Sequence, residues 1–169
     1  GPPVLGSATA DAGGKWRLAL AQQSEGAHNY KAVAMNAAGT KGEANLALTI
    51  DTTPPAPPAI AAVTDDAGAV RGTLANGGFT DDAKPTLSGS GAKAGDKIRI
   101  YDNGTAIGSR TVEADGSWKF DFSIVIPPLK EGAHRLTATA VDPVGNESAP
   151  STDFVLTVDT IAPATPAAA

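Results

Sequence analysis

Residues 97–105 read KIRIYDNGT, and this stretch decides the fold. Ile98 and Ile100 alternate with Lys97 and Arg99, which is the period of two that puts successive side chains on opposite faces of a β-strand. An Asn-Gly pair follows, and this pair is the strongest short signal for a two-residue hairpin turn. The stretch therefore predicts a strand, a tight turn and a returning antiparallel strand.

The same alternation recurs on both sides of this hairpin. Leu136, Ala138 and Ala140 share one face of a later segment, and Phe154, Leu156 and Val158 share one face of the last. We expect seven strands between turn signals, at residues 59–64, 85–91, 97–102, 105–112, 117–123, 133–141 and 152–159. Two apolar faces can then close on each other, so the fold class is all-β, a seven-stranded β-sandwich. Trp118 and Trp16 are expected to be core aromatics.

The chain contains an internal repeat of roughly 100 residues, the size of a complete sandwich. The segments that recur are 6–16 at 108–118, 25–28 (EGAH) at 131–134, and 48–52 (LTIDT) at 156–160 (LTVDT). Residues 1–52 thus match only the C-terminal half of a unit, residues 53–160 form a complete unit, and residues 161–169 resemble a linker to a next repeat.

The half unit lacks the first three strands of its sandwich, so its sheet edges should be exposed and open to pairing. We expect either disorder in residues 1–52 or completion by strands of a neighbouring molecule.

Composition narrows the function further. Nineteen Gly, 13 Pro and an aromatic content of 5% favour many short elements over a helical bundle. The net charge of −5 argues against nucleic acid as a partner, since phosphate binding needs clustered Lys and Arg. The chain has no cysteine and hence no disulfide or thiolate metal site. No apolar run approaches the ~20 residues that span a bilayer, so no membrane insertion is expected.

No catalytic constellation is apparent, and we expect no enzymatic activity. His28 and His134 are the two histidines, and each follows the same Glu-Gly turn of the repeat, which favours a structural role. Neither a nucleophile elbow nor a phosphate-binding loop occurs in the sequence.

The acidic residues are the informative ones. Because consecutive strands of a sandwich run in opposite directions, the topology gathers up to six carboxylates at the C-terminal pole, next to the Pro-rich linker: Asp65, Asp66, Asp81, Asp82, Asp102 and Asp159. The opposite, N-terminal pole should carry Asp51, Asp96, Asp142 and Asn146. Crowded carboxylates repel, and a bound divalent cation reverses that repulsion. Calcium suits oxygen ligands on flexible loops best. The alternative is that each Asp simply forms a turn or ends a strand.

The order of motifs resembles bacterial Ig-like domains, which are strung along giant surface adhesins and biofilm proteins of Gram-negative bacteria. The resemblance rests on VTDDAG (63–68), NGG (76–78), TDD (80–82), PTLSG (85–89), YDNG (101–104), ADGSW (114–118), ATAVD (138–142) and GN (145–146). It implies an Ig-like seven-stranded sandwich, type I export to the cell surface, and calcium at domain junctions.

By this resemblance the candidate metal ligands are Asp51, Asp65, Asp66, Asp81, Asp82, Asp142 and Asp159. The half unit departs from the pattern, with Asn36 in the place of Asp142 and Thr40 in the place of Asn146.

The expected function is a stalk or spacer segment of a secreted bacterial surface adhesin that calcium stiffens at the junctions. Its partners are then adjacent repeats of the same chain, while other domains contact a host surface or the biofilm matrix. One alternative is a module that itself binds a glycan or host protein, for which Tyr101 and Phe79 are the candidate contacts. Another is a separator between catalytic domains of a secreted enzyme.

Overall fold

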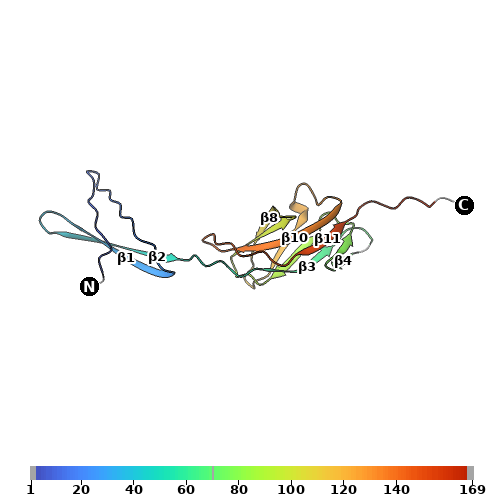
Figure 1. The fold of residues 1–169 in the computed structure, drawn as a ribbon, viewed down its shortest axis with the longest axis horizontal. Coiled ribbons are helices and arrows are strands. Elements are labelled where there is room, and N and C mark those ends of the chain that lie inside the picture. Colours follow the sequence, from blue (N-terminus) through green and yellow to red (C-terminus); the bar gives the residue numbers. More distant parts are fainter. Residues whose placement is uncertain (1–2, 70, 167–169) are drawn as a thin grey trace. The chain divides into compact units, whose positions relative to one another are not determined.

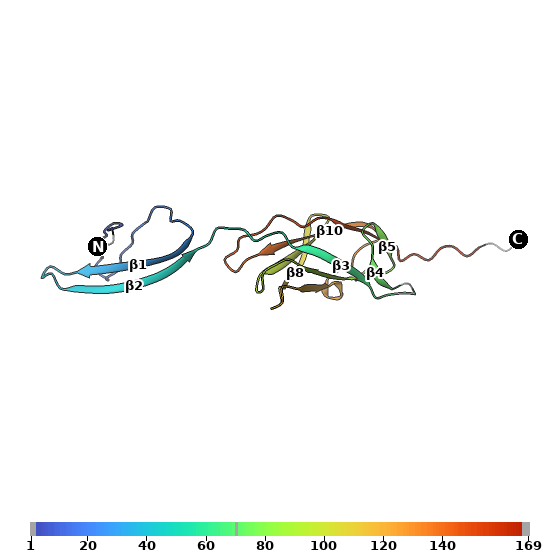
Figure 2. The same ribbon diagram turned by 90° about the horizontal axis from the view of Figure 1, so that it is seen from below.

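The computed structural model describes residues 3–69 and 71–166, and the chain divides into two compact units, Gly1–Thr52 and Thr53–Ala169. The second unit is a sandwich of two sheets (Figures 1 and 2). One sheet has the strand order β5-β11-β10-β7-β8 and the other has the order β4-β3-β6-β9. Its strands are β3 (Ala59–Asp65), β4 (Gly72–Leu74), β5 (Gly78–Thr80), β6 (Thr86–Ser90), β7 (Lys97–Asp102), β8 (Thr105–Thr111), β9 (Trp118–Asp121), β10 (Gly132–Val141) and β11 (Phe154–Val158).

The predicted sandwich is confirmed, and all seven predicted strands are present. Two short strands, β4 and β5, also occur between residues 65 and 85, where the sequence pattern predicts no strand. β5 pairs in parallel with β11, so it brings the residues after Thr80 beside the end of the last strand. At the central hairpin, Asn103 and Gly104 both have positive φ angles, of 48° and 80°, which confirms the tight turn between β7 and β8.

The core of the second unit lies between its two sheets. Ile98 and Ile100 of β7 pack there with Leu136 of β10 and Leu156 of β11, all fully buried. Trp118 is 2% exposed, as predicted, and it lies against Gly89, where an added Cβ would overlap the indole ring and the Ala59 carbonyl oxygen. A glycine at 89 is therefore the condition for a tryptophan at 118.

The first unit is a two-stranded antiparallel sheet of β1 (Gly26–Met35) and β2 (Lys41–Ile50). Residues 3–25 precede it without an assigned strand. The prediction for Trp16 is wrong, since this side chain is 59% exposed. Its position in the repeat is that of Trp118, but the strands that would cover it are not present among the described residues of the first unit.

Candidate functional site

The C-terminal pole of the second unit gathers the ends of three strands. β3 ends at Asp65, β5 ends at Thr80 just before the Asp81-Asp82 pair, and β11 ends one residue before Asp159. The Asp159 amide donates a hydrogen bond of 2.8 Å to the carbonyl of Thr80 and so joins the last strand to the β5 loop. Sheet pairing therefore places carboxylates from three distant parts of the sequence at one end of the sandwich.

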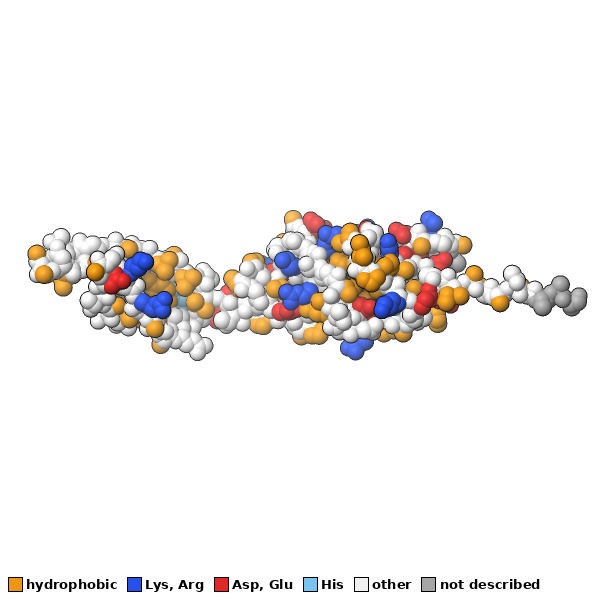
Figure 3. Space-filling view, turned by 90° about the horizontal axis from the view of Figure 1, so that it is seen from above, with side chains coloured by type: hydrophobic (Ala, Val, Ile, Leu, Met, Phe, Trp, Pro, Cys, Tyr) orange, Lys and Arg blue, Asp and Glu red, His pale blue; other side chains and the backbone are white. Residues whose placement is uncertain are grey.

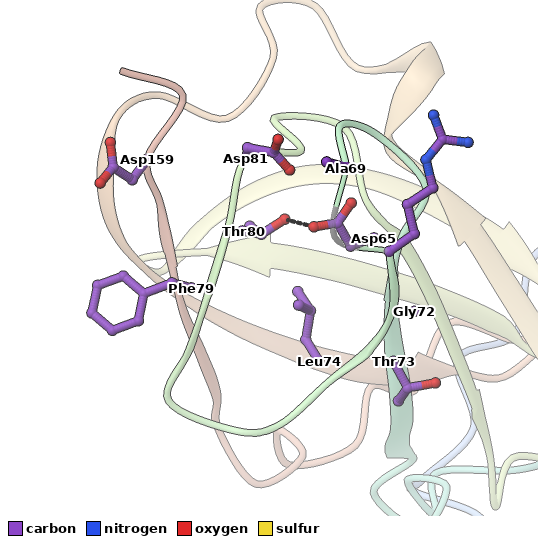
Figure 4. Close-up of a pocket in the computed structure, with 10 residues that line it drawn as sticks. Asp65, Ala69, Gly72, Thr73, Leu74, Phe79, Thr80, Asp81 and Asp159 are labelled. Atoms are coloured by element: carbon purple, nitrogen blue, oxygen red, sulfur yellow. Dashed lines mark hydrogen bonds between the residues drawn. The ribbon is translucent and has the colours of Figure 1, made fainter. Parts of the chain in front are cut away.

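A hollow of about 410 Å³ opens between these strand ends (Figure 4). Asp65, Asp81 and Asp159 line it, together with the exposed ring of Phe79. Arg71 also lines the hollow, and its Nε donates to the carbonyl of Gly68. The hollow thus combines three carboxylates with one guanidinium at the point where the chain leaves the domain.

Asp65 and Asp82 are buried, each 4% exposed, and hold the loops of this pole in place. Asp65 accepts from the Thr80 hydroxyl at 2.6 Å and from the Ala67 amide at 3.0 Å. Asp82 accepts from the Lys84 amide at 2.7 Å and from the Asp66 amide at 3.2 Å. Among the described residues, the hydrogen-bond donors to these two carboxylates are all uncharged, and neither carboxylate takes part in an ion pair.

The neighbouring carboxylates of Asp66 and Asp81 are exposed. Asp81 lies against Gly68, where an added Cβ would overlap its carboxylate, and Gly68 has a φ of 59°. The backbone at Gly68 therefore leaves room for the Asp81 side chain. The structure brings Asp65, Asp81 and Asp159 around one hollow, but among residues 3–69 and 71–166 no three His, Asp or Glu side chains form a group that could hold a metal ion.

The sequence predicts Asp102 at this pole as well, but Asp102 does not line the hollow. Its Oδ2 lies 2.8 Å from Nδ1 of His134, whose Nε2 lies 2.8 Å from the carbonyl oxygen of Lys130. Because a carbonyl oxygen can only accept, Nε2 of His134 carries the hydrogen of the contact with Lys130. Nδ1 faces the Asp102 carboxylate, and the His134 side chain is buried. The aspartate at the end of β7 is thus the partner of a buried histidine rather than a member of the pole.

At the N-terminal pole, Asp142 folds its own loop. Its Oδ1 accepts from the amides of Val144, Gly145 and Asn146 at 2.7–3.0 Å, and its Oδ2 accepts from the Asn146 side chain at 2.8 Å. Loss of solvation opposes ionisation, but the hydrogen bonds from Asn146, Gly145 and Val144 outweigh it and lower the pKa of Asp142. Asp96, which directly precedes β7, is buried and 2% exposed. Asp51 follows β2 in the first unit.

The two units use one device to start the linker, which the sequence analysis missed. In the second unit Glu131 accepts from the amide and the hydroxyl of Thr160, and in the first unit Glu25 does the same for Thr52. Each threonine directly follows the candidate ligand Asp159 or Asp51. The repetition of Glu and Thr at matching positions was a signal that could have revealed this clamp.

A second missed residue is Glu147, on the outer face of the larger sheet. It accepts from Thr139 at 2.6 Å and from Tyr101 at 2.8 Å, and it forms an ion pair with Arg99 at 2.8 Å. Hydrogen bonds from Thr139 and Tyr101, followed by the charge of Arg99, lower the pKa of Glu147 against the cost of desolvation. Beside this network runs a groove of about 510 Å³ that Tyr101, Arg135 and Asp153 line.

The second unit matches a family model. Residues 56–160 match the bacterial Ig-like domain, and the chain belongs to this family.

Several solved structures also match the chain, with TM-scores of 0.40 or less. Fibronectin(III)-like modules of Clostridium thermocellum CbhA share 17% identity with a TM-score of 0.36, over 50% of this chain and 90% of theirs. A biofilm-associated protein (BSP domain) and a Ca²⁺-stabilised adhesin with which an Antarctic bacterium binds ice share 22% identity each, with TM-scores of 0.40.

The biofilm-associated match covers 80% of this chain and 20% of that one, and the ice-binding match covers 82% and 33%. The chain thus spans a fifth to a third of these two structures. No curated protein matches the chain. In the described part of the chain, no helix is long and apolar enough to cross a membrane.

Proposed function

We propose that the chain is a structural spacer segment of a bacterial surface adhesin, and that calcium at the junctions between its Ig-like units makes the segment stiff. The observation that carries this proposal is the C-terminal pole, where Asp65, Asp81 and Asp159 surround a hollow at the exit of the chain. A ligand bound there lies between the domain and whatever follows it.

The donor types at the pole are those that calcium prefers, although no three acidic or histidine side chains of the described residues are already grouped as a metal site. Ca²⁺ takes about 6–8 oxygen ligands from carboxylates, carbonyls and water. Asp81 and Asp159 line the hollow with exposed carboxylates, Asp66 is exposed in the adjoining loop, and Asp65 and Asp82 carry charge that uncharged donors alone satisfy. We assign Asp66, Asp81 and Asp159 as direct ligands and Asp65 and Asp82 as the residues that shape the loops. Calcium supplies the positive charge that relieves the repulsion among them.

The Glu–Thr clamps support a junction role. Because Glu131 fixes Thr160, the backbone after Asp159 starts in one direction, and Glu25 and Thr52 act in the same way after Asp51. Proline residues 54, 55, 57 and 58 further restrict the following linker. A metal bound beside such a linker would then need to fix few remaining degrees of freedom.

Two measurements on the 169-residue chain test this proposal. Small-angle scattering in calcium should give a larger maximum dimension than in chelator, because a bridged junction bends less. Calorimetry should detect calcium binding, and at 10 mM calcium a site with a Kd near 1 mM would stabilise the second unit by about 1.4 kcal/mol. No change in dimension together with no heat of binding would sink the proposal.

Matched variants locate the sites. Asp81→Asn with Asp159→Asn should abolish binding at the C-terminal pole, whereas Glu113→Gln with Asp115→Asn removes the same charge from the exposed β8–β9 turn and should leave binding intact. For the junction between units, Asp51→Asn should remove the calcium-dependent change in dimension, and Asp11→Asn in the first unit is its control. Equal effects of pole and turn variants would mean that calcium only screens net charge.

The groove on the larger sheet supports a second candidate function, binding of a glycan. Tyr101 offers one ring flank, and the Arg135–Asp153 ion pair and Thr137 offer polar groups along the same groove. The groove thus offers an aromatic ring beside polar groups that could hydrogen-bond to a sugar. A glycan array with the chain, repeated with Tyr101→Ala, distinguishes the two functions, since a spacer gives no hits.

A further inference from the structure

The first unit presents the same hairpin as the second, but with this face only partly covered: His28, Tyr30 and Ala32 of β1 are half-buried, and the leucines of β2 are exposed. The register Gly26↔Ile50, Ala27↔Thr49 and His28↔Leu48 of β1 and β2 repeats as Gly132↔Val158, Ala133↔Thr157 and His134↔Leu156 in β10 and β11. In the second unit this face is core: Leu136 and Leu156 are fully buried. In the first unit Leu46 is 61% and Leu48 is 46% exposed, and apolar side chains lie open on that unit (Figure 3).

The edge of the hairpin is open as well. In the second unit, residues 136–141 of β10 pair with β7. The matching residues of β1 are 30–35, and among the described residues β1 pairs with β2 alone. An open edge beside an exposed apolar face is a template for an added strand.

A histidine marks which strand would fit. Nε2 of His28 lies 2.7 Å from the carbonyl of Ser24, four residues back, as Nε2 of His134 does with Lys130. Nδ1 of His134 meets the carboxylate of Asp102, the last residue of β7. Nδ1 of His28 has no hydrogen-bond partner among the residues that the structure describes. In the first unit, Nε2 of His28 is therefore bound as in the second unit, whereas no acidic group of the described residues binds Nδ1.

We infer that the open face and edge of the β1–β2 hairpin bind the N-terminal half of a bacterial Ig-like unit, whose β7-like strand pairs with residues 30–35 and brings an aspartate to Nδ1 of His28. The pairing continues the sheet by main-chain hydrogen bonds, and the remaining strands of that half cover Leu46, Leu48 and Trp16. The complementarity of imidazole and carboxylate sets the register of the added strand, because a shift by one residue moves the aspartate to the other face.

A fusion supplies this partner in a defined way. In the fusion, a second copy of residues 53–106 replaces residues 1–4, so that Leu5 follows in the place of Ile107. We expect amide exchange at residues 30–35 to slow by about a hundredfold relative to the parent chain, since a frayed edge becomes an inner strand. Acrylamide should quench the fluorescence of Trp16 less in the fusion than in the parent chain. Trp118 is 2% exposed and therefore contributes little to the quenching of the parent.

Variants within the added copy separate apolar cover from the aspartate. Ile98→Asn with Ile100→Asn in the copy should abolish the protection of β1. Asp102→Asn in the copy should reduce it by about tenfold, as expected for loss of a charge-assisted hydrogen bond, and Lys97→Ala, an exposed position of the same strand, should leave it unchanged.

The alternative occupant is a second copy of the chain through a β1–β1 pairing. Light scattering that finds the parent to be a dimer with β1 as well protected as in the fusion would overturn the inference in favour of self-pairing. A fusion in which β1 and Trp16 stay as accessible as in the parent, while exchange in β7 and β10 of the second unit is normal, would overturn it outright.

Discussion

The hairpins β1–β2 and β10–β11 have matching sequences and one register, yet one is a solvent-exposed pair of strands and the other is the centre of a core. Local contacts are the same in both: a histidine bound to the carbonyl four residues back, and a glutamate bound to the first linker threonine. The difference teaches that hairpin geometry follows from nearby residues, whereas burial depends on strands distant in sequence.

The largest expected effect comes from the two tryptophans. Trp118→Ala should destabilise the second unit by about 3–5 kcal/mol, because it leaves a cavity among fully buried residues. Trp16→Ala should change the stability of the first unit by no more than about 0.5 kcal/mol, since the side chain is already in water. Urea denaturation followed by circular dichroism measures both.

Similar losses for the two substitutions would contradict the comparison, for then Trp16 would be packed as firmly as its counterpart. Trp118→Phe and Trp16→Phe are controls that keep most of the apolar side chain. Their losses of stability should differ less from each other than those of the two alanine variants.

Sequence patterns were sufficient for what depends on neighbours. The alternation at 97–102 and the Asn-Gly turn placed β7 and β8 correctly, and the alternation at 136–140 and 154–158 placed β10 and β11. Period-two patterning could not reveal β4 and β5, because each has only three residues. It could not place Trp16 either, since the motif around it is the one that buries Trp118.

The candidate site shows the same division. Strand order brought Asp65, Asp81 and Asp159 to one pole, as topology predicted. The sequence could not tell which carboxylates are already committed, and Asp65 and Asp82 proved to bind loop amides while Asp102 binds His134. Such commitments depend on atomic distances across the sheet, which spacing alone does not encode.

The histidine pair sharpens the comparison at intermediate size. His134→Ala should cost the second unit about 1–3 kcal/mol, because the nearly buried Asp102 carboxylate loses its partner. His28→Ala should cost the first unit much less, as its ring has only the bond to Ser24 and a stacking contact with Tyr30. Urea midpoints of both variants test this, and an equal loss in the two units would show that the Asp102 contact adds nothing.

A fall in pH should reduce the stability of the second unit, through Glu147, by a smaller amount. The pKa of Glu147 is lowered from its ordinary 4.5 in the folded state, so its contribution to stability is complete above pH 4.5 and is lost as the pH falls through the folded value. With a half-exposed ion pair to Arg99 the effect should stay below about 1 kcal/mol. Glu147→Gln should flatten the decline of the second unit's stability below pH 4.5, and a decline as steep as that of the parent chain would contradict this prediction.

The smallest expected effect is at Asp142, whose place in the first unit Asn36 occupies. Asn36 already forms this turn without a charge, since its Oδ1 accepts from the amides of Ala38 and Thr40 at 3.0 Å. Asp142→Asn therefore keeps the three amide bonds to Oδ1 and loses only the acceptor for the Asn146 side chain. In chelator the thermal midpoint of the second unit should move by less than about 2 °C.

The same variant in calcium distinguishes a turn former from a ligand. If Asp142 binds the ion, Asp142→Asn should remove part of the calcium-dependent stabilisation while leaving the midpoint in chelator almost unchanged. A variant that responds to calcium as fully as the parent would assign Asp142 to the turn alone and would leave the N-terminal pole without its proposed metal ligand. The replacement of Asp142 by Asn36 in the first unit would then make no difference to calcium binding.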